Sequence, residues 1–351
     1  MKLINQDKLS RREFLHFFIS GTLGLANLSL APFHLSKKSS EGTPAVACLG
    51  RVLFDDVTAF SEPDPQSAVR EAFSFNDVLN ITKIIQGKHY NHSNSLWYEL
   101  KNGTYVQTTN IQQVENRLNE PRLEINKRGE LAMITVPYAQ AWKSYRSNRK
   151  GYQLFYYGSN HWVIGIVENE EGEIFYKIRE DRWADLYTVS ARYMHIFHED
   201  ELQPLSQQTP LEDKHIEVSI AEQLLIAYET GKPVFLSRLS SGLLTENKDL
   251  STPRGEFKIN YKRPSRHMVH TDKVSINDAE LYGVPWMSYF TDTGIAFHGT
   301  YWHNDFGTPH SHGCINLPLN AARWIYLWCQ PVVPPLEKKF VSNFGTQVVI
   351  I

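Results

Sequence analysis

The sequence predicts a mainly β protein built from several modules. Short runs of β-branched and aromatic residues recur along most of the chain, with turn residues between them. Residues 320–329 instead place apolar side chains at helical spacing, which predicts one clear helix. The chain has 351 residues, of which 42% are hydrophobic, so it is long enough for two or three domains with packed cores.

The charges and cysteines exclude two classes of protein. The chain carries 36 Lys and Arg against 38 Asp and Glu, a formal net charge of -2, with the two signs well mixed. Because a nucleic-acid surface needs clustered basic residues, no nucleic-acid partner is expected. Three cysteines, Cys48, Cys314 and Cys329, are too few for a disulfide framework. Cys329 falls on the apolar face of the predicted helix, so it is expected in the core.

The N-terminus predicts export. Residues 10–15 read Ser-Arg-Arg-Glu-Phe-Leu and precede a mildly apolar run at 17–30. Paired arginines before a short, weakly apolar segment are typical of a twin-arginine signal. The run is shorter than the roughly 20 residues of a membrane-spanning helix. Residues 1–47 are therefore predicted to be a signal and linker, with cleavage near 45–47. The cleavage site and any lipidation of Cys48 stay open, although an incidental apolar role for Cys48 is preferred.

Residues 48–116 are predicted to form a first β module. Residues 81–85 form a strand, and 97–100 and 104–106 form a hairpin. The Asn-Gly pair between them is expected to supply the positive φ angles of its turn. A Trp-bearing strand, a glycine turn and a Tyr-Val strand resemble the end of bacterial SH3-like barrels, so an SH3-like module is expected here.

Residues 117–210 are predicted to form a second β-rich module and a linker. Strands at 162–167 and 174–178 flank a polar hairpin loop. Residues 187–190 echo the strand at 105–106, which indicates a second, SH3-like copy of the first module. Whether the two stretches are one module or two stays open. Most of their aromatic residues are expected in cores, with glycan contact by the SH3-like module as the alternative.

Residues 211–351 are predicted to form a last, separate β domain. Residues 252–255 read Thr-Pro-Arg-Gly, a turn in which proline presets φ and glycine closes the chain. The predicted helix belongs to this domain. Its expected strands are residues 215–220, 224–228, 233–237 and 345–350.

One segment of this domain has the residues that nucleophilic catalysis needs. Phe-His-Gly-Thr at 297–300 is followed by Ser-His-Gly-Cys-Ile-Asn at 311–316. A cysteine attacks as its thiolate, and a nearby imidazole accepts its proton. Gly313 permits a sharp turn, which could direct backbone N–H groups at a developing oxyanion. Cys314 is therefore the predicted nucleophile.

These residues resemble the L,D-transpeptidases of the YkuD type. The hallmark of that family is His-Gly, a loop, and then Ser/Thr-His-Gly-Cys-apolar-Asn/Arg, which residues 298–316 match throughout. The turn at 252–257 and the strand opening at His215 match its N-terminal half. The resemblance covers the whole last domain and implies a β-sandwich catalytic fold with one or two helices.

The resemblance also implies roles for individual residues. Cys314 would attack a tetrapeptide stem between its third residue and its terminal D-Ala, with His298 as base and the Gly299 carbonyl orienting that imidazole. The oxyanion hole would use the N–H groups of His312, Gly313 and Cys314. A lid over the donor is expected from residues 263–290. Substrate contacts are expected at Ser311, Trp302, Asn316 and Tyr289.

No metal or cofactor is expected. His303, His310 and His312, with Asp305 nearby, follow neither a helical His-Glu-x-x-His pattern nor paired Cys-x-x-Cys spacing. An acyl exchange between peptides also needs no nucleotide. Four further histidines are expected to be solvated residues of polar segments: His89, His92, His267 and His270.

The predicted function is cross-linking of peptidoglycan stem peptides by an exported cysteine enzyme, with a tetrapeptide donor and an amine acceptor. Three alternatives stay open. An L,D-carboxypeptidase would use water as acceptor, and a wall-binding protein would have lost activity. A metal-dependent wall hydrolase would use the clustered histidines. The sequence does not fix the acceptor (stem peptide, water or protein) or the oligomeric state.

Overall fold

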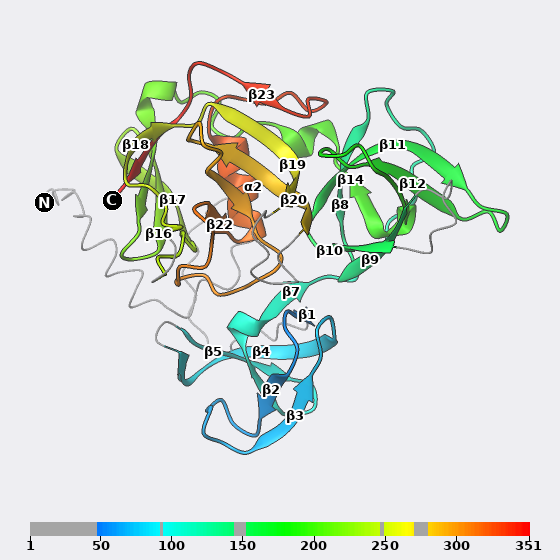
Figure 1. The fold of residues 1–351 in the computed structure, drawn as a ribbon, viewed down its shortest axis with the longest axis vertical. Coiled ribbons are helices and arrows are strands. Elements are labelled where there is room, and N and C mark those ends of the chain that lie inside the picture. The colour runs from blue at the N-terminus through cyan, green and yellow to red at the C-terminus, as the bar shows by residue number, and fades with distance from the viewer. Residues whose placement is uncertain (1–47, 92–93, 144–151, 246–248, 270–279) are drawn as a thin grey trace, which may run out of the picture. The chain divides into compact units, whose positions relative to one another are not determined.

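The described residues form mainly β-strands, which confirms the predicted fold class (Figure 1). The predicted export signal lies outside the described residues. Within the part of the chain that the structure describes, no helix is long and apolar enough to cross a membrane. The computed structural model describes residues 48–91, 94–143, 152–245, 249–269 and 280–351.

Two seven-stranded sheets are built from the first half of the described chain (Figure 1). The first sheet comprises β1 (Cys48–Val52), β2 (Val57–Phe60), β3 (Val69–Phe73), β4 (Val78–Asn91), β5 (Asn94–Leu100), β6 (Tyr105–Gln107) and β7 (Ile111–Val114). The second comprises β8 (Glu130–Ile134), β9 (Tyr138–Lys143), β10 (Tyr152–Tyr156), β11 (Asn160–Glu168), β12 (Ile174–Arg179), β13 (Leu186–Ser190) and β14 (Met194–Ile196).

The two sheets repeat one strand order. The first runs β3-β2-β6-β5-β4-β1-β7 and the second runs β10-β9-β13-β12-β11-β8-β14. When the strands of each sheet are numbered from one in chain order, the two orders are identical. A short 3-10 helix precedes the seventh strand in both, η1 (Thr108–Asn110) and η2 (Ala191–Tyr193). The internal repeat is thus confirmed in the strand order, whereas the SH3-like character and the module boundaries stay predictions.

The turn between β5 and β6 differs from its prediction. Only Gly103 has a positive φ, of 81°, so the expectation that Asn102 shares that conformation is wrong. Gly103 N–H donates to Leu100 O at 2.9 Å, and Leu100 N–H donates to Thr104 O at 2.8 Å. The loop is therefore longer than two residues, and such loops need a left-handed residue only where the turn ends.

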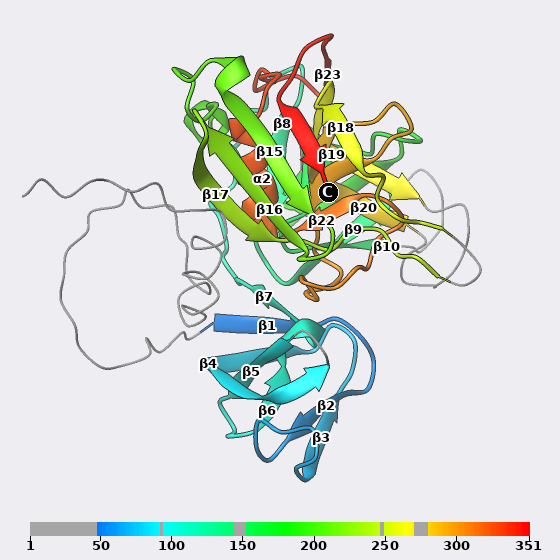
Figure 2. The same cartoon turned by 90° about the vertical axis from the view of Figure 1, so that its left-hand side faces the viewer.

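Two five-stranded sheets and one helix follow (Figure 2). The third sheet has the order β17-β16-β15-β24-β18, and the fourth has the order β22-β21-β20-β19-β23. Two 3-10 helices, η3 (Glu199–Leu202) and η4 (Leu211–Asp213), precede the third sheet. The third sheet comprises β15 (Lys214–Ser219), β16 (Leu224–Glu229), β17 (Lys232–Arg238), β18 (Gly255–Lys258) and β24 (Gln347–Ile350). The fourth comprises β19 (Tyr261–Val269), β20 (Glu280–Tyr289), β21 (Ala296–Gly299), β22 (Ile315–Leu317) and β23 (Phe340–Val341).

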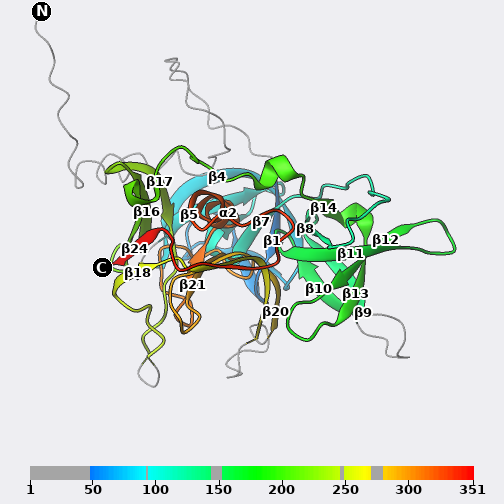
Figure 3. The ribbon, with the colours of Figure 1, turned by 90° about the horizontal axis from the view of Figure 1, so that it is seen from above.

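The helix α2 (Leu319–Trp328) confirms the predicted helix to within one residue at each end. It lies between the third and fourth sheets: Trp324 stacks on Phe235 of β17 at 4.2 Å, and the other side of the helix contacts β20 and β21 (Figure 3). Cys329 is fully buried in the core that both sheets and α2 share, as predicted. Burial of such an apolar stripe between layers stabilises a helix of this length.

The segment predicted as a lid, residues 263–290, contains two paired strands, and its role stays a prediction. Residues 261–269 and 280–289 pair as the antiparallel strands β19 and β20, and β20 is buried over most of its length. The sequence of β20 accounts for this burial, because residues 281–287 form a nearly continuous apolar run typical of a strand covered on both faces. Residues 270–279, the middle of the predicted lid, lie outside the described residues.

Candidate active site

Strand register brings His298 and Cys314 together. β21 and β22 pair in parallel, with Phe297 opposite Ile315 and His298 opposite Asn316. Paired residues of a parallel ladder face the same side, and the side alternates along each strand. Cys314 lies two residues before Asn316 and directly precedes β22. It therefore approaches the sheet on the side to which His298 points. The segment that ends in Cys314 thus meets the strand that carries His298.

The imidazole of His298 has a defined orientation. The residue is 1% exposed, and its Nδ1 lies 3.2 Å from the carbonyl oxygen of Gly299. Because a carbonyl oxygen only accepts hydrogen bonds, this contact places the proton on Nδ1 and leaves Nε2 as the basic nitrogen. The ring of Trp302 lies 5.6 Å from the imidazole. Gly299 thus lies where the orienting role requires it, although the role itself stays a prediction.

The turn before Cys314 is held by the hydroxyl of Ser311. That hydroxyl donates to the carbonyl oxygen of Cys314 and accepts the N–H of Gly313 at 3.1 Å. The Gly313 N–H therefore already has a partner, and its prediction as an oxyanion donor is not supported in this arrangement. The N–H groups of His312 and Cys314 stay predicted donors. Ser311 is 5% exposed, so its contacts fix the turn, and its predicted substrate contact is untested.

The hydroxyl of Thr252 also holds this turn. Thr252 Oγ1 donates to the carbonyl oxygen of Gly313 at 2.8 Å and accepts the N–H of Gly242 at 2.9 Å. Gly313 has φ of +115°, which L side chains rarely adopt. A Cβ on Gly242 would lie 2.9 Å from the Cα of Gly313, so the two backbones approach too closely for a side chain. Sequence reasoning identified Thr252 only as part of a turn and missed this contact.

The thiol of Cys314 is protonated in the resting site. The residue is half-buried, yet burial of its sulfur raises the pKa to about 11, against a smaller lowering by a hydrogen bond from the Ala296 N–H. The sulfur also lies 3.9 Å from Gly294 O, an acceptor for the S–H. At neutral pH the reactive thiolate must therefore form by transfer of the proton to a base.

Tyr289 lies beside the sulfur. It pairs with Ala296 across β20 and β21, and Ala296 supplies the N–H that meets Cys314. Burial raises the pKa of the Tyr289 phenol, while the charges of Arg266 and Arg263 lower it. The phenol is thus neutral, and the charges of both arginines and of Cys314 act on it. Its predicted substrate contact stays a prediction.

Asn316 and His303 form a buried pair next to the motif. Asn316 is 2% exposed, and its Nδ2 lies 2.7 Å from Nε2 of His303. His303 stacks on His310 at 4.3 Å. Burial, and then the charges of His310 and His298, lower the pKa of His303 well below its usual value, so it stays neutral. The predicted substrate contact of Asn316 is untested, but in this structure its side chain holds His303.

His267 corrects another prediction. It was expected to be solvated, but it is 1% exposed, and its Nδ1 lies 2.8 Å from the carboxylate of Glu180. Its ring stacks on Tyr282 at 4.0 Å and meets Trp183 edge-on at 4.8 Å. The prediction failed because residues 180–183, far away in sequence, cover this part of β19. His89 is exposed, as expected, while His92 and His270 lie outside the described residues.

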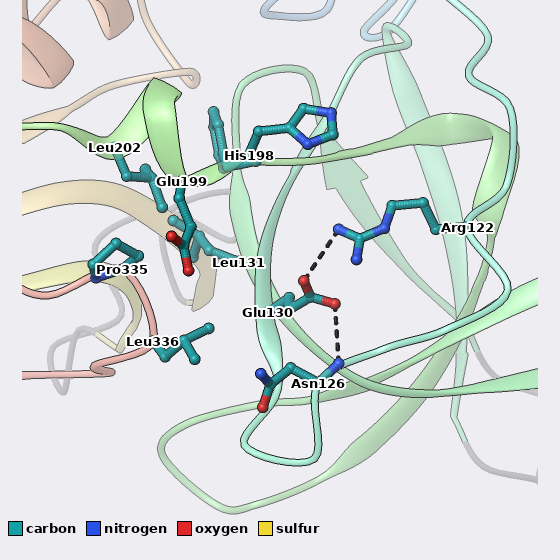
Figure 4. Close-up of a pocket in the computed structure, with 10 residues that line it drawn as sticks. Arg122, Asn126, Glu130, Leu131, His198, Glu199, Leu202, Pro335 and Leu336 are labelled. Carbon is teal, nitrogen blue, oxygen red and sulfur yellow. Dashed lines mark hydrogen bonds and ion pairs between the residues drawn. The ribbon is translucent and has the colours of Figure 1, made fainter.

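A pocket of about 370 Å³ lies apart from the predicted site residues (Figure 4). Its charged residues include Glu130 and Arg122, which form an ion pair at 3.1 Å. None of the predicted site residues lines it. Among the described residues, no group of three or more His, Cys, Asp and Glu gathers as metal ligands would. The pocket is lined by Arg122, Asn126, Glu130, Leu131, Phe197, His198, Glu199, Leu202, Pro335 and Leu336.

Comparisons with known proteins concern the same part of the chain. Residues 213–350 match the family model of the L,D-transpeptidase catalytic domain, YkuD. A putative L,D-transpeptidase of Bacillus subtilis, YciB, is 30% identical over 128 residues, which cover 33% of this chain and 62% of that protein. The chain thus covers less than two thirds of this curated relative.

Solved structures of similar proteins include two L,D-transpeptidases. A crystal structure of a mutant enzyme from Enterococcus faecium is 23% identical over 40% of this chain and 50% of that chain, with a TM-score of 0.31. An enzyme from Mycobacterium smegmatis is 16% identical over 53% of this chain and 98% of that chain, with a TM-score of 0.32.

Proposed function

We propose that the protein cross-links peptidoglycan stem peptides outside the cytoplasm, because residues 213–350 match the L,D-transpeptidase catalytic domain of the YkuD family. Cys314 is the proposed nucleophile and His298 the proposed base. The donor is a tetrapeptide stem, and the acceptor is the amine of a second stem. We propose export through the twin-arginine signal of residues 10–30, since this substrate lies in the cell wall.

The contact that carries this proposal is the one between His298 Nδ1 and the carbonyl oxygen of Gly299, at 3.2 Å. It fixes the tautomer in which Nε2 carries no proton, on a strand that pairs with the segment after Cys314. A thiol with a pKa of about 11 needs such a base at neutral pH. The pair supports nucleophilic acyl transfer by a cysteine.

Acylation follows from these positions. The proton of the Cys314 thiol moves to Nε2 of His298 as the sulfur attacks the carbonyl carbon between the third residue of the donor and its terminal D-Ala. Backbone N–H groups at the turn stabilise the oxyanion of the tetrahedral intermediate. The C–N bond then breaks, the proton passes from Nε2 to the departing amine of D-Ala, and a thioester remains on Cys314.

Transfer reverses the same steps with a new amine. The acceptor amine attacks the thioester carbon and loses a proton to Nε2 of His298. The C–S bond breaks, and the sulfur of Cys314 recovers its proton. One amide is broken and one is made, so the exchange is close to isoenergetic and draws on no nucleotide.

The test incubates the purified protein, and Cys314→Ala beside it, with a disaccharide-tetrapeptide, and follows the products by mass spectrometry. Release of D-Ala together with a cross-linked dimer, both absent with Cys314→Ala, is the expected result. Release of D-Ala without dimer would replace the transferase by an L,D-carboxypeptidase that uses water as acceptor. An absence of any Cys314-dependent product would favour an inactive wall-binding protein.

A second test uses the thioester chemistry alone. One similar catalytic domain, from Enterococcus faecium, was solved acylated by ertapenem, and a further L,D-transpeptidase was solved in complex with imipenem. We expect a carbapenem to add its mass to this protein and not to Cys314→Ala. An unchanged intact mass after incubation would count against a reactive thiol at this site.

A further inference from the structure

We propose that Arg263 and Arg266 form a subsite beside Cys314 that binds a carboxylate group of the donor peptide. This inference rests on the proposed function, because it names the part of the donor that the site recognises. It also gives the second sheet a part in substrate binding, through Asp181 in the loop between β12 and β13.

The two arginines share one carboxylate. Arg263 Nη2 lies 2.5 Å and Arg266 Nη1 lies 2.9 Å from the same oxygen of Asp181, Oδ2. The other oxygen, Oδ1, accepts the backbone N–H of His267 at 2.6 Å. Both oxygens of Asp181 are therefore in use, and this carboxylate orients the two guanidinium groups without neutralising both.

The two arginines carry more positive charge and more hydrogen-bond donors than Asp181 can match. Two cations and one anion leave a net charge of +1, and the neighbouring carboxylate of Glu180 is engaged with His267 and with the N–H groups of Arg182 and Trp183. Each guanidinium carries five N–H donors. Arg263 Nε is buried, and among the described residues no acceptor meets it. The donors that an incoming acceptor can reach are those of the partly exposed guanidinium groups.

A short series of contacts links the arginines to the nucleophile. Tyr261, two residues before Arg263 on β19, pairs with Tyr289 and stacks on it at 4.7 Å. Tyr289 pairs in turn with Ala296, whose N–H meets the sulfur of Cys314. The side chains of both arginines are only partly covered, 13% exposed for Arg263 and 27% for Arg266. The charges of both arginines and of Cys314 all act on Tyr289, so a donor that passes Tyr289 can reach the arginines while its scissile bond lies at Cys314.

The chemistry of the pair selects a carboxylate. The guanidinium fork matches the two oxygens of a carboxylate, and such charge-assisted pairs are the strongest hydrogen bonds that side chains make. A tetrapeptide stem carries one carboxylate at its terminal D-Ala and further carboxylates on its acidic residues. Either source presents the same group, so the experiment has to separate the two.

The test measures kcat and KM for the full chain and for Arg266→Gln with three forms of the tetrapeptide donor. The first is the free acid, the second is amidated at the terminal D-Ala, and the third is amidated at its side-chain carboxylates. With the free acid we expect Arg266→Gln to raise KM about 10- to 100-fold with little change in kcat. With the form that lacks the recognised carboxylate, the full chain should be equally poor and Arg266→Gln should have no further effect.

Three control variants accompany this test. Arg266→Lys keeps the charge and should recover part of the affinity for the free acid. Asp181→Asn should raise KM, because it releases the two arginines from their common partner. Arg70→Gln, at an exposed residue of β3, should leave kcat and KM unchanged. Thermal unfolding shows which variants are folded, and Arg266→Gln is preferred over Arg263→Gln because Arg266 is the more exposed.

Two results would overturn the subsite. One is an Arg266→Gln penalty of equal size on all three donors, and the other is no penalty at all. If the full chain makes no Cys314-dependent product, the proposed function fails first. Calorimetry of the three peptides with Cys314→Ala, and with Cys314→Ala combined with Arg266→Gln, then decides the subsite. Binding of the free acid that is lost on amidation and with Arg266→Gln supports it, and equal binding overturns it.

Discussion

The guanidinium of Arg51 donates to the main-chain oxygen of Tyr301 at 2.6 Å, and Tyr301 follows His298 by three residues. Arg51 is 1% exposed, and its other hydrogen-bond partners are neutral: Oε1 of Gln112 at 2.7 Å and Oδ1 of Asn76 at 2.9 Å. Burial lowers the pKa of this guanidinium to about 10, so it remains charged at neutral pH. The first sheet thereby holds the segment that follows His298, the proposed base.

Replacing Arg51 by Met should therefore affect both stability and turnover. Three buried acceptors lose their donor, which lowers the free energy of unfolding by about 2–4 kcal/mol. Because the segment after His298 loses a support, kcat should fall more than KM rises. Urea unfolding and donor turnover measure the two effects, with Arg70→Met on the exposed part of β3 as control. Unchanged kcat in a destabilised variant would show that the contact serves the fold alone.

The pKa of Cys314 predicts an unusual dependence of alkylation on pH. With a folded-state pKa of about 11, the thiolate fraction at pH 7 is about one part in 10,000. The rate of labelling by iodoacetamide should rise about tenfold per pH unit and still be rising above pH 9. Peptide mass spectrometry separates Cys314 from Cys48, and protein unfolded in urea provides the reference rate. A plateau below pH 8 would instead indicate a resting thiolate paired with a charged imidazole.

Thr252 offers a test of the turn that carries the nucleophile. Thr252→Val keeps the shape of the side chain but removes the hydroxyl that joins Gly242 to Gly313. Each lost buried hydrogen bond costs about 1 kcal/mol, so turnover should fall by roughly tenfold or more. Thr252→Ser retains the hydroxyl and should stay close to the parent protein. Equal losses for the Val and Ser variants would attribute the effect to packing of the methyl group.

The buried lysine Lys262 should matter for stability. Its Nζ donates to the carbonyl oxygens of Tyr326, Cys329 and Pro331 at 2.5, 2.9 and 2.8 Å, where α2 ends. Lys262→Met leaves these acceptors without a donor, and the free energy of unfolding should fall by about 2–4 kcal/mol. Lys258→Met, at an exposed residue of β18, is the matched control. Equal denaturation midpoints for the two variants would contradict the role of this contact.

Features encoded locally could be predicted from the sequence. The hairpin joining β5 to β6 and the helix α2 each depend on residues close together in the chain. The proposed nucleophile and base are also local, since Cys314 directly precedes β22 and His298 lies on its neighbour β21. The Tyr-Thr-Val echo of the Tyr-Val strand also indicated the repeat, because Tyr187 and Tyr105 lie on the equivalent strands β13 and β6.

Contacts between distant segments could not be predicted. Thr252 lies 61 residues from its partner Gly313, and Arg51 lies 250 residues from Tyr301. No local pattern encodes such pairs. The apolar run in β20 shows burial, but it does not show which elements cover the strand. His267 was likewise judged by its polar neighbours, although a loop of the second sheet covers it.

The position of β24 determines when the third sheet can be completed during synthesis of the chain. This strand, residues 347–350, lies between β15 and β18 and runs parallel to β15, the first strand of its sheet. On the ribosome, β15 emerges more than a hundred residues before its partner, whereas the two seven-stranded sheets are complete far earlier. Domains made first fold first. A chain interrupted before residue 347 therefore carries a folded N-terminal half but an incomplete third sheet, so the matched region of residues 213–350 is complete only after its last strand has been made.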